Sequence, residues 1–301
     1  MFPFTILIDT NFDIPQEFID ENSLVVIPIP FNIDGTAHNG GRWQEITPAE
    51  FYKALADGSV AGTALINPEV FTEIFTDYAQ RGESLLVIVL SSGLSGTYQN
   101  SVIALADVKE KYPDCDIFTV DSTTAAGGAG LMAAMAVRKR SEGLSTAETA
   151  AWLEENKHHC ISLFTVDDLM FLHRGGRLSR FSAVAGSIIG IKPLLNVAPD
   201  GTLKLKDKVR GRNGALDKLL SQMLQSLEPG AELETVIISH SNCVSDADAL
   251  AEKIKASVNV KEVIVTMMGP VIGAHVGPGT VALFFESGMT RTEYEKKFYS
   301  K

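Results

Sequence analysis

The chain has 301 residues, of which 45% are hydrophobic and 21% charged, and its formal net charge is −11 at pH 7. This composition is typical of a globular protein long enough for two domains, and the negative charge argues against binding nucleic acid through phosphate neutralisation. No apolar run approaches the roughly 20 residues of a membrane span, and the N-terminus lacks the basic start of a signal peptide. The three widely spaced cysteines, Cys115, Cys160 and Cys243, fit reduced thiols. We therefore expect a cytoplasmic protein that is not integral to a membrane.

The first half of the chain alternates apolar strands with amphipathic helices, a pattern that favours a mainly parallel α/β sheet. Strands are predicted over residues 4–9, 24–29, 85–90 and 116–120, with a continuation of the second strand over 31–33 and a hairpin turn at Asp34-Gly35. Helices are predicted to begin at Pro15 and Pro48 and to cover 68–79, 98–108, 125–140 and 146–156, with 58–67 as a linker.

A Ser/Gly-rich turn, Ser91-Ser92-Gly93-Leu94-Ser95-Gly96-Thr97, joins the third of these strands to the next helix. A turn of this kind can hold an anion at a helix N-terminus, where backbone N–H groups and hydroxyls converge. Ser95 or Thr97 can equally serve only as the helix N-cap. Asp9 and Asp121-Ser122 also fall at predicted strand ends, so we expect them to share one crevice with this turn.

The second half is predicted to form another α/β unit that begins near residue 159. Strands are expected over 160–166, 191–197, 203–209, 234–240, 260–268 and 280–286, with a hairpin turn at Asp200-Gly201. Helices are expected before Arg174 and over 179–190, 213–227, 245–258 and the charged tail. The segment 269–279, rich in glycine and proline, is predicted to be a stiff loop that carries His275.

Few residues outside this turn are candidates for ligand binding or catalysis. His275 could donate to a carboxylate or be a structural residue, and Arg177 and Arg210, in Gly-flanked loops, could bind anions or be solvated. Gly93-Leu94-Ser95-Gly96-Thr97 matches a hydrolase nucleophile elbow only in part, because Thr97 stands where a glycine belongs. The sequence has neither a P-loop nor metal-ligand spacing.

Five segments occur in an order and at separations that together resemble the DegV family of fatty-acid-binding proteins, and the resemblance covers nearly the whole chain. They are Ser91-Ser92-Gly93-Leu94-Ser95-Gly96-Thr97-Tyr98, Val120-Asp121-Ser122, Gly175-Gly176-Arg177, Ile191-Lys192-Pro193-Leu194 and Gly273-Ala274-His275-Val276-Gly277-Pro278-Gly279.

The resemblance implies two α/β domains, residues 1–158 and 159–301, with one long-chain fatty acid in a cleft between them. It implies no enzymatic activity and no cofactor besides the lipid. The protein would present the carboxylate to a separate ATP-dependent fatty acid kinase subunit, in bacteria, for phospholipid synthesis. By motif, the fatty acid would be bound by Thr63, Ser92, Ser95, Gly96 and His275. Arg177 and Arg210 would contact the partner or the phosphate.

One segment departs from the family pattern, which usually reads Thr-Ser-Gln-Pro-Ser/Thr-Pro before the helix. Here it reads Thr63-Ala64-Leu65-Ile66-Asn67-Pro68, which removes a hydroxyl from the lid of the site. The apolar tunnel is expected to include residues 183–191. Two alternatives stay open: a Ser-dependent hydrolase or other enzyme acting on a small carboxylate or ester, and a lipid sensor without a kinase partner.

Overall fold

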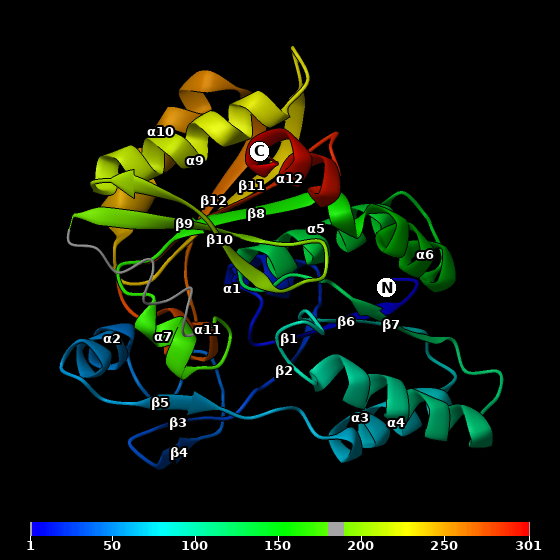
Figure 1. Ribbon diagram of the computed structural model, residues 1–301. Helices are drawn as coiled ribbons and strands as arrows, with labels where there is room; N and C mark the ends of the chain where they lie inside the picture. Colours follow the sequence, from blue (N-terminus) through cyan, green and yellow to red (C-terminus); the bar gives the residue numbers. More distant parts are fainter. Residues whose placement is uncertain (1, 180–189, 301) are drawn as a thin grey trace.

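The structure is a computed structural model that describes residues 2–179 and 190–300, and it has a mixed α/β fold (Figure 1). A four-stranded, fully parallel sheet with the order β2-β1-β6-β7 forms the centre of the first half, as the alternating pattern predicts. Its strands are β1 (Thr5–Asp9), β2 (Val25–Ile27), β6 (Leu85–Val89) and β7 (Ile117–Asp121). Its helices are α1 (Gln16–Glu21), α2 (Pro48–Ala56), α3 (Pro68–Arg81), α4 (Thr97–Lys111), α5 (Gly127–Ser141) and α6 (Thr146–Asn156).

A small antiparallel sheet with the order β4-β3-β5 corrects two of the predictions. β3 (Phe31–Ile33) does not continue β2, because the chain turns away at Pro30 and β3 pairs with β4 (Thr36–His38) through the predicted Asp34-Gly35 hairpin. The predicted linker contains β5 (Ala61–Thr63), which is held by backbone pairing with β3.

A six-stranded mixed sheet with the order β10-β9-β8-β13-β11-β12 forms the centre of the second half. The strands are β8 (Cys160–Thr165), β9 (Ile191–Val197), β10 (Leu203–Arg210), β11 (Glu232–His240), β12 (Asn259–Met267) and β13 (Val281–Glu286). The helical segments are η1 (Lys157–His159), α7 (Met170–Arg174), α9 (Arg212–Ser226), α10 (Val244–Ser257), α11 (Pro270–Val276) and α12 (Arg291–Tyr299). The helix expected over 179–190 lies almost wholly outside the described residues.

The two large sheets are stacked with α5 between them (Figure 1). α5 contacts β1 and β6 of the parallel sheet on one side and β8, β11 and β13 of the mixed sheet on the other. The predicted close packing of this Ala- and Gly-rich helix is confirmed. A Cβ at Gly127 would lie only 2.7 Å from Phe284. Helices α9 and α10 cover the outer face of the mixed sheet, and α3 and α4 pack on the parallel sheet.

The Gly/Pro-rich segment after β12 is a short helix, which corrects the predicted loop. Pro270 takes the first turn of α11, and Gly277 ends the helix with a φ of +68°. A Cβ at Gly273 would lie 2.7 Å from Phe51 and 2.8 Å from the Tyr52 hydroxyl of α2. The glycines therefore allow α11, from the second half of the chain, to pack closely against the first half. None of the described helices is long and apolar enough to cross a bilayer.

Candidate functional site

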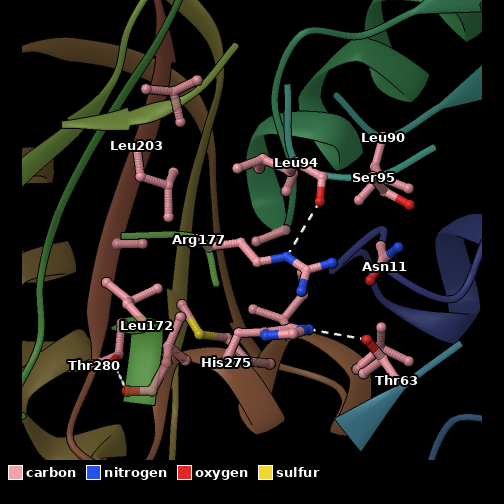
Figure 2. A pocket seen from close by; sticks show the side chains of 18 of the residues that line it. Asn11, Thr63, Leu90, Leu94, Ser95, Leu172, Arg177, Leu203, His275 and Thr280 are labelled. Carbon is pink, nitrogen blue, oxygen red and sulfur yellow. Dashed lines mark hydrogen bonds between the residues drawn. The ribbon is translucent and has the colours of Figure 1, made fainter. Parts of the chain in front are cut away.

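A mostly apolar cavity lies between the carboxyl ends of the parallel strands, the mixed sheet and α11. It encloses about 790 Å³ of empty space, including the part that opens to solvent. Its apolar wall comes from distant parts of the chain and includes Leu90, Phe164, Leu172, Val197, Leu203 and Phe284. Its polar residues, Asn11, Thr63, Ser95, Arg177, His275 and Thr280, come from both halves of the chain (Figure 2).

The Ser/Gly turn lies where the sequence predicts, between β6 and α4. The N-cap of α4 is Gly96, without a side-chain cap, so the expectation that Ser95 or Thr97 takes this position is wrong. The Ser95 hydroxyl instead accepts from the Thr97 N–H at 3.3 Å and lies 3.0 Å from the Thr97 hydroxyl. Ser95 lines the cavity, as does Leu94.

The tip of the β9–β10 hairpin is docked on the same turn. The buried Ser91 hydroxyl donates to the Gly201 carbonyl at 2.8 Å. A Cβ at Gly93 would lie 2.7 Å from the Asp200 carbonyl, so only glycine permits this approach. The hairpin carries Val197 and Leu203 into the cavity wall.

Thr63 and His275 meet inside the cavity although 212 residues separate them. The Thr63 hydroxyl, at the end of β5, lies 2.9 Å from His275 Nε2 on α11 (Figure 2). The other ring nitrogen, Nδ1, has no hydrogen-bond partner in the described structure. A Cβ at Gly175 would lie 2.2 Å from it. Burial, with a smaller contribution from the positive charge of Arg177, lowers the pKa of His275 to about 4, so the imidazole is neutral at pH 7.

Arg177 supplies a positive charge within the cavity wall. Its Nε donates to the Leu94 carbonyl at 3.1 Å (Figure 2). Its Nη1 donates to the Gly175 carbonyl. Burial lowers the pKa of this guanidinium, which nevertheless stays protonated because its ordinary pKa is above 12. The side chain is thus held by two backbone carbonyls rather than by a carboxylate, and its charge is available to an anion.

Asn11 is a cavity residue that the sequence analysis did not single out. It is 2% exposed, lines the cavity, and its Oδ1 has no hydrogen-bond partner in the described structure. The only signal for it was its place just after a strand that ends in Asp9. Asp9 itself is buried behind the wall, where its Oδ1 accepts from the Asn11 N–H at 2.8 Å. Burial raises the pKa of Asp9 to about 7.

A crevice does lie at these strand ends, lined by Asn11, Leu90, Ser95 and Ala125 after β1, β6 and β7. Of the residues predicted to share it, the Ser/Gly turn contributes Ser95, whereas Asp9 and Ser122 do not line it. Asp121 does not line it. Its carboxylate accepts from the backbone N–H groups of Ser92 and Thr123, and it thereby joins the turn after β6 to the segment after β7.

Several residues predicted from the family motifs lie outside the cavity lining. Ser92, Gly96 and Arg210 are exposed and are not among the lining residues, and Arg210 lies at the end of the edge strand β10. The tunnel expected over 183–191 falls outside the described residues except at 190–191. In the changed lid segment, Ala64 lines the cavity, whereas Ile66 is buried in the core beside α3.

The geometry does not form a Ser-His-Asp triad among the described residues. Ser95 bonds to Thr97, and His275 bonds to Thr63. His275 Nδ1, which a triad would direct at a carboxylate, faces Gly175 instead. The described residues also contain no group of three His, Cys, Asp or Glu side chains that could hold a metal ion.

Fold and cavity together define a mixed α/β protein with a mostly apolar internal cavity that several polar side chains line. The sequence model of the family described as "Uncharacterised protein, DegV family" matches residues 3–288. A DegV domain-containing protein of Clostridium perfringens is 39% identical over 282 residues, which are 94% of this chain and 97% of the relative. A DegV domain-containing protein of Streptococcus pyogenes is 36% identical over 93% of this chain and 97% of its own length. The chain belongs to the DegV family.

Solved structures with the same fold include proteins described as binding fatty acids. A DegV family protein from Thermus thermophilus, described by its fatty acid binding, matches with a TM-score of 0.84 at 28% identity, covering 95% of this chain and 100% of that one. A protein of Thermotoga maritima, described as revealing a fatty acid binding function, matches with a TM-score of 0.80 at 28% identity and the same coverage.

Proposed function

We propose that this protein binds one long-chain fatty acid, with the acyl chain in the apolar cavity and the carboxylate at its polar end. The observation that carries the proposal is that Thr63, Ser95, Arg177 and His275 lie close together in the wall of a mostly apolar cavity (Figure 2). Fatty-acid binding by solved relatives supports the same ligand class.

The chemistry of the two ends matches the two ends of such a ligand. Burial of the acyl chain contributes about 0.8 kcal/mol per CH₂, so a chain of about 16 carbons supplies most of the affinity. The carboxylate meets the positive charge of Arg177 and hydroxyl donors from Ser95 and Thr63. Neutral His275 with its proton on Nε2 donates to the Thr63 hydroxyl, which leaves the hydroxyl hydrogen of Thr63 for the carboxylate.

The test is native mass spectrometry of the purified protein, followed by lipid extraction and titration of the delipidated protein with palmitate. We expect one bound fatty acid per chain. Ser95→Ala should weaken palmitate binding by about tenfold or more, since one hydrogen bond to a charged group contributes roughly 1.5–3 kcal/mol. Ser92→Ala is the matched control, because Ser92 belongs to the same turn but does not line the cavity. A protein that carries no lipid and takes up neither palmitate nor oleate would contradict the proposal.

We further propose that the bound carboxylate is presented to a separate ATP-dependent kinase subunit in the bacterial cytoplasm, where an acyl phosphate is made for phospholipid synthesis. Arg210, exposed at the sheet edge, is then a candidate partner contact, and Arg177 serves the carboxylate or the phosphate. With a bacterial kinase subunit added, His275→Ala should reduce acyl phosphate formation more than palmitate binding, because the acyl chain supplies most of the affinity. Equal loss of both activities would argue against this role of His275.

A further inference from the structure

Residues 266–269, which are the end of β12 and its connection to α11, are held by pairing with β11 and by side chains from the first 52 residues. α11 carries His275, and its first residue, Pro270, follows this connection directly. The position of His275 in the cavity therefore depends on how this connection is fixed.

Arg42 makes the central contacts. Its Nη1 donates to the Ile14 carbonyl at 2.6 Å, and its Nη2 donates to the Met267 carbonyl at 2.6 Å and to the Thr266 hydroxyl at 3.1 Å. One guanidinium thus joins the segment after β1 to the end of β12. Only the forked donor geometry of arginine serves both sides at once.

Asp13 and Tyr52 form hydrogen bonds with the next two residues, Gly269 and Met268. The Asp13 carboxylate is fully buried, lies 3.6 Å from Arg42 Nη2, and accepts from the Gly269 N–H at 3.0 Å. The Tyr52 hydroxyl donates to the Met268 carbonyl at 2.8 Å. Each of the four residues 266–269 is therefore bonded to a side chain of the first half.

We propose that Arg42 is a positioning residue of the polar end of the cavity: through residues 266–269 it fixes α11, and with it the distance between His275 and Thr63. Arg42 does not line the cavity. It acts through the helix and not by touching the ligand. The part of this inference that concerns ligand binding rests on the proposed function, whereas the part that concerns His275 does not.

Arg140 is a matched control within the same chain. Its guanidinium also donates to two backbone carbonyls, those of Phe4 at 3.2 Å and Asn22 at 2.7 Å. Neither of these hydrogen bonds involves α11 or residues 266–269. Loss of Arg140 therefore removes a comparable set of contacts without releasing the connection that carries His275.

The first arm of the test follows His275 by NMR in the delipidated full-length protein, with its signal assigned from a His275→Gln variant. In the parent protein and in Arg140→Ala, the His275 signal should not titrate between pH 5 and 8. In Arg42→Ala the helix is released and the imidazole becomes more hydrated, so its midpoint should move upward into that range. An unchanged His275 signal in Arg42→Ala, with a fall in melting temperature like that of Arg140→Ala, would overturn the proposal.

The second arm compares palmitate with 1-hexadecanol, which has the same chain and no carboxylate. Arg42→Ala should weaken palmitate binding about tenfold and leave hexadecanol binding within about twofold of the parent. A merely structural role would weaken both ligands equally. If the parent protein binds neither ligand, the proposed function fails, and the NMR arm still decides the role of Arg42.

Milder variants keep the test decisive if Arg42→Ala does not fold. Arg42→Lys keeps the charge but cannot reach both sides, and Thr266→Val removes one acceptor of Nη2. Both should shift the His275 midpoint in the same direction by a smaller amount. A folded Arg42→Lys protein with an unshifted His275 midpoint and parental selectivity for palmitate would also overturn the proposal.

Discussion

His275 shows what burial does to a single titratable group. The unfolded chain takes up its proton near pH 6.5, whereas the folded protein does so only near pH 4. The stabilisation that accompanies the neutral imidazole is therefore present above pH 6.5 and is lost as the pH falls from 6.5 towards 4. We expect His275→Gln to flatten this part of the stability curve. The measurement is urea unfolding of both proteins at several pH values, and parallel curves would contradict the expectation.

Asp9 has the opposite dependence over an overlapping range of pH. Burial raises its pKa from 3.8 to about 7, so its contribution to stability is fully present below pH 3.8 and is lost as the pH rises through 7. Asp9→Asn keeps an acceptor for the Asn11 N–H but cannot ionise. We expect the variant to gain stability relative to the parent as the pH rises from 5 to 8. Chemical unfolding at pH 5 and at pH 8 gives the free energy of unfolding of both proteins. A variant that is less stable relative to the parent at pH 8 than at pH 5 would contradict this expectation.

The side chains of the polar end were partly predictable from the sequence. Ser95 and His275 stand in recognisable motifs, and Thr63 follows from the family resemblance. Asn11 had only its place after a strand end as a signal, and Arg42 carries no local signal. The role of Arg42 depends on the Thr266 hydroxyl and the Met267 carbonyl, more than 220 residues away in the chain, and no pattern of spacing encodes such contacts.

At the level of secondary structure, α11 and β5 were missed for a common reason. Ala61-Gly62-Thr63 has weak strand propensity, and the seven residues of α11 contain a glycine and are bounded by two more. Both elements exist because of tertiary contacts: β5 pairs with β3, and α11 packs on α2. The long strands and helices, with strong periodicity, were predicted to within a few residues.

The turn after α7 gives a test at this scale. Gly175→Ala would place a Cβ 2.2 Å from His275 Nδ1, so either the turn or α11 must shift. We expect several-fold weaker palmitate binding. Gly176→Ala is the control, because Gly176 has a φ of +74° and nothing within reach of a Cβ, so it adds backbone strain without touching His275. Titration with palmitate separates the two, and equal losses would show that strain in the turn, not the contact with His275, matters.

For the whole molecule, the sequence predicted two α/β halves but not how they are joined. A boundary near residue 158 stays a prediction. The described structure has α5 between the two large sheets and α11 reaching back to α2. The many Ala and Gly residues of α5 predicted close packing against a sheet. Which sheets the helix contacts depends on the arrangement of the whole chain, and local sequence does not encode it.

A ligand held between parts of both halves should stabilise the whole chain. Binding to the native state alone adds RT ln(1 + [L]/Kd), or about 2.7 kcal/mol when the free ligand is at 100 times Kd. We expect palmitate to raise the melting temperature of the delipidated protein in a concentration-dependent way, and Ser95→Ala to need more palmitate for the same rise. Differential scanning calorimetry measures this. A melting temperature that does not change on addition of palmitate would contradict the binding of a buried ligand.

The docking of the β9–β10 hairpin on the Ser/Gly turn has a consequence for the rate at which a ligand can enter and leave the cavity. Val197 and Leu203 of the hairpin form part of the cavity wall, and the Ser91–Gly201 hydrogen bond holds the hairpin tip in place. For the fatty acid proposed above, exchange through this wall requires the hairpin to separate from the turn, so the rate by that route depends on the opening of the protein more than on the strength of the lipid's contacts. The docking of this hairpin therefore helps to set how long the proposed fatty acid stays bound.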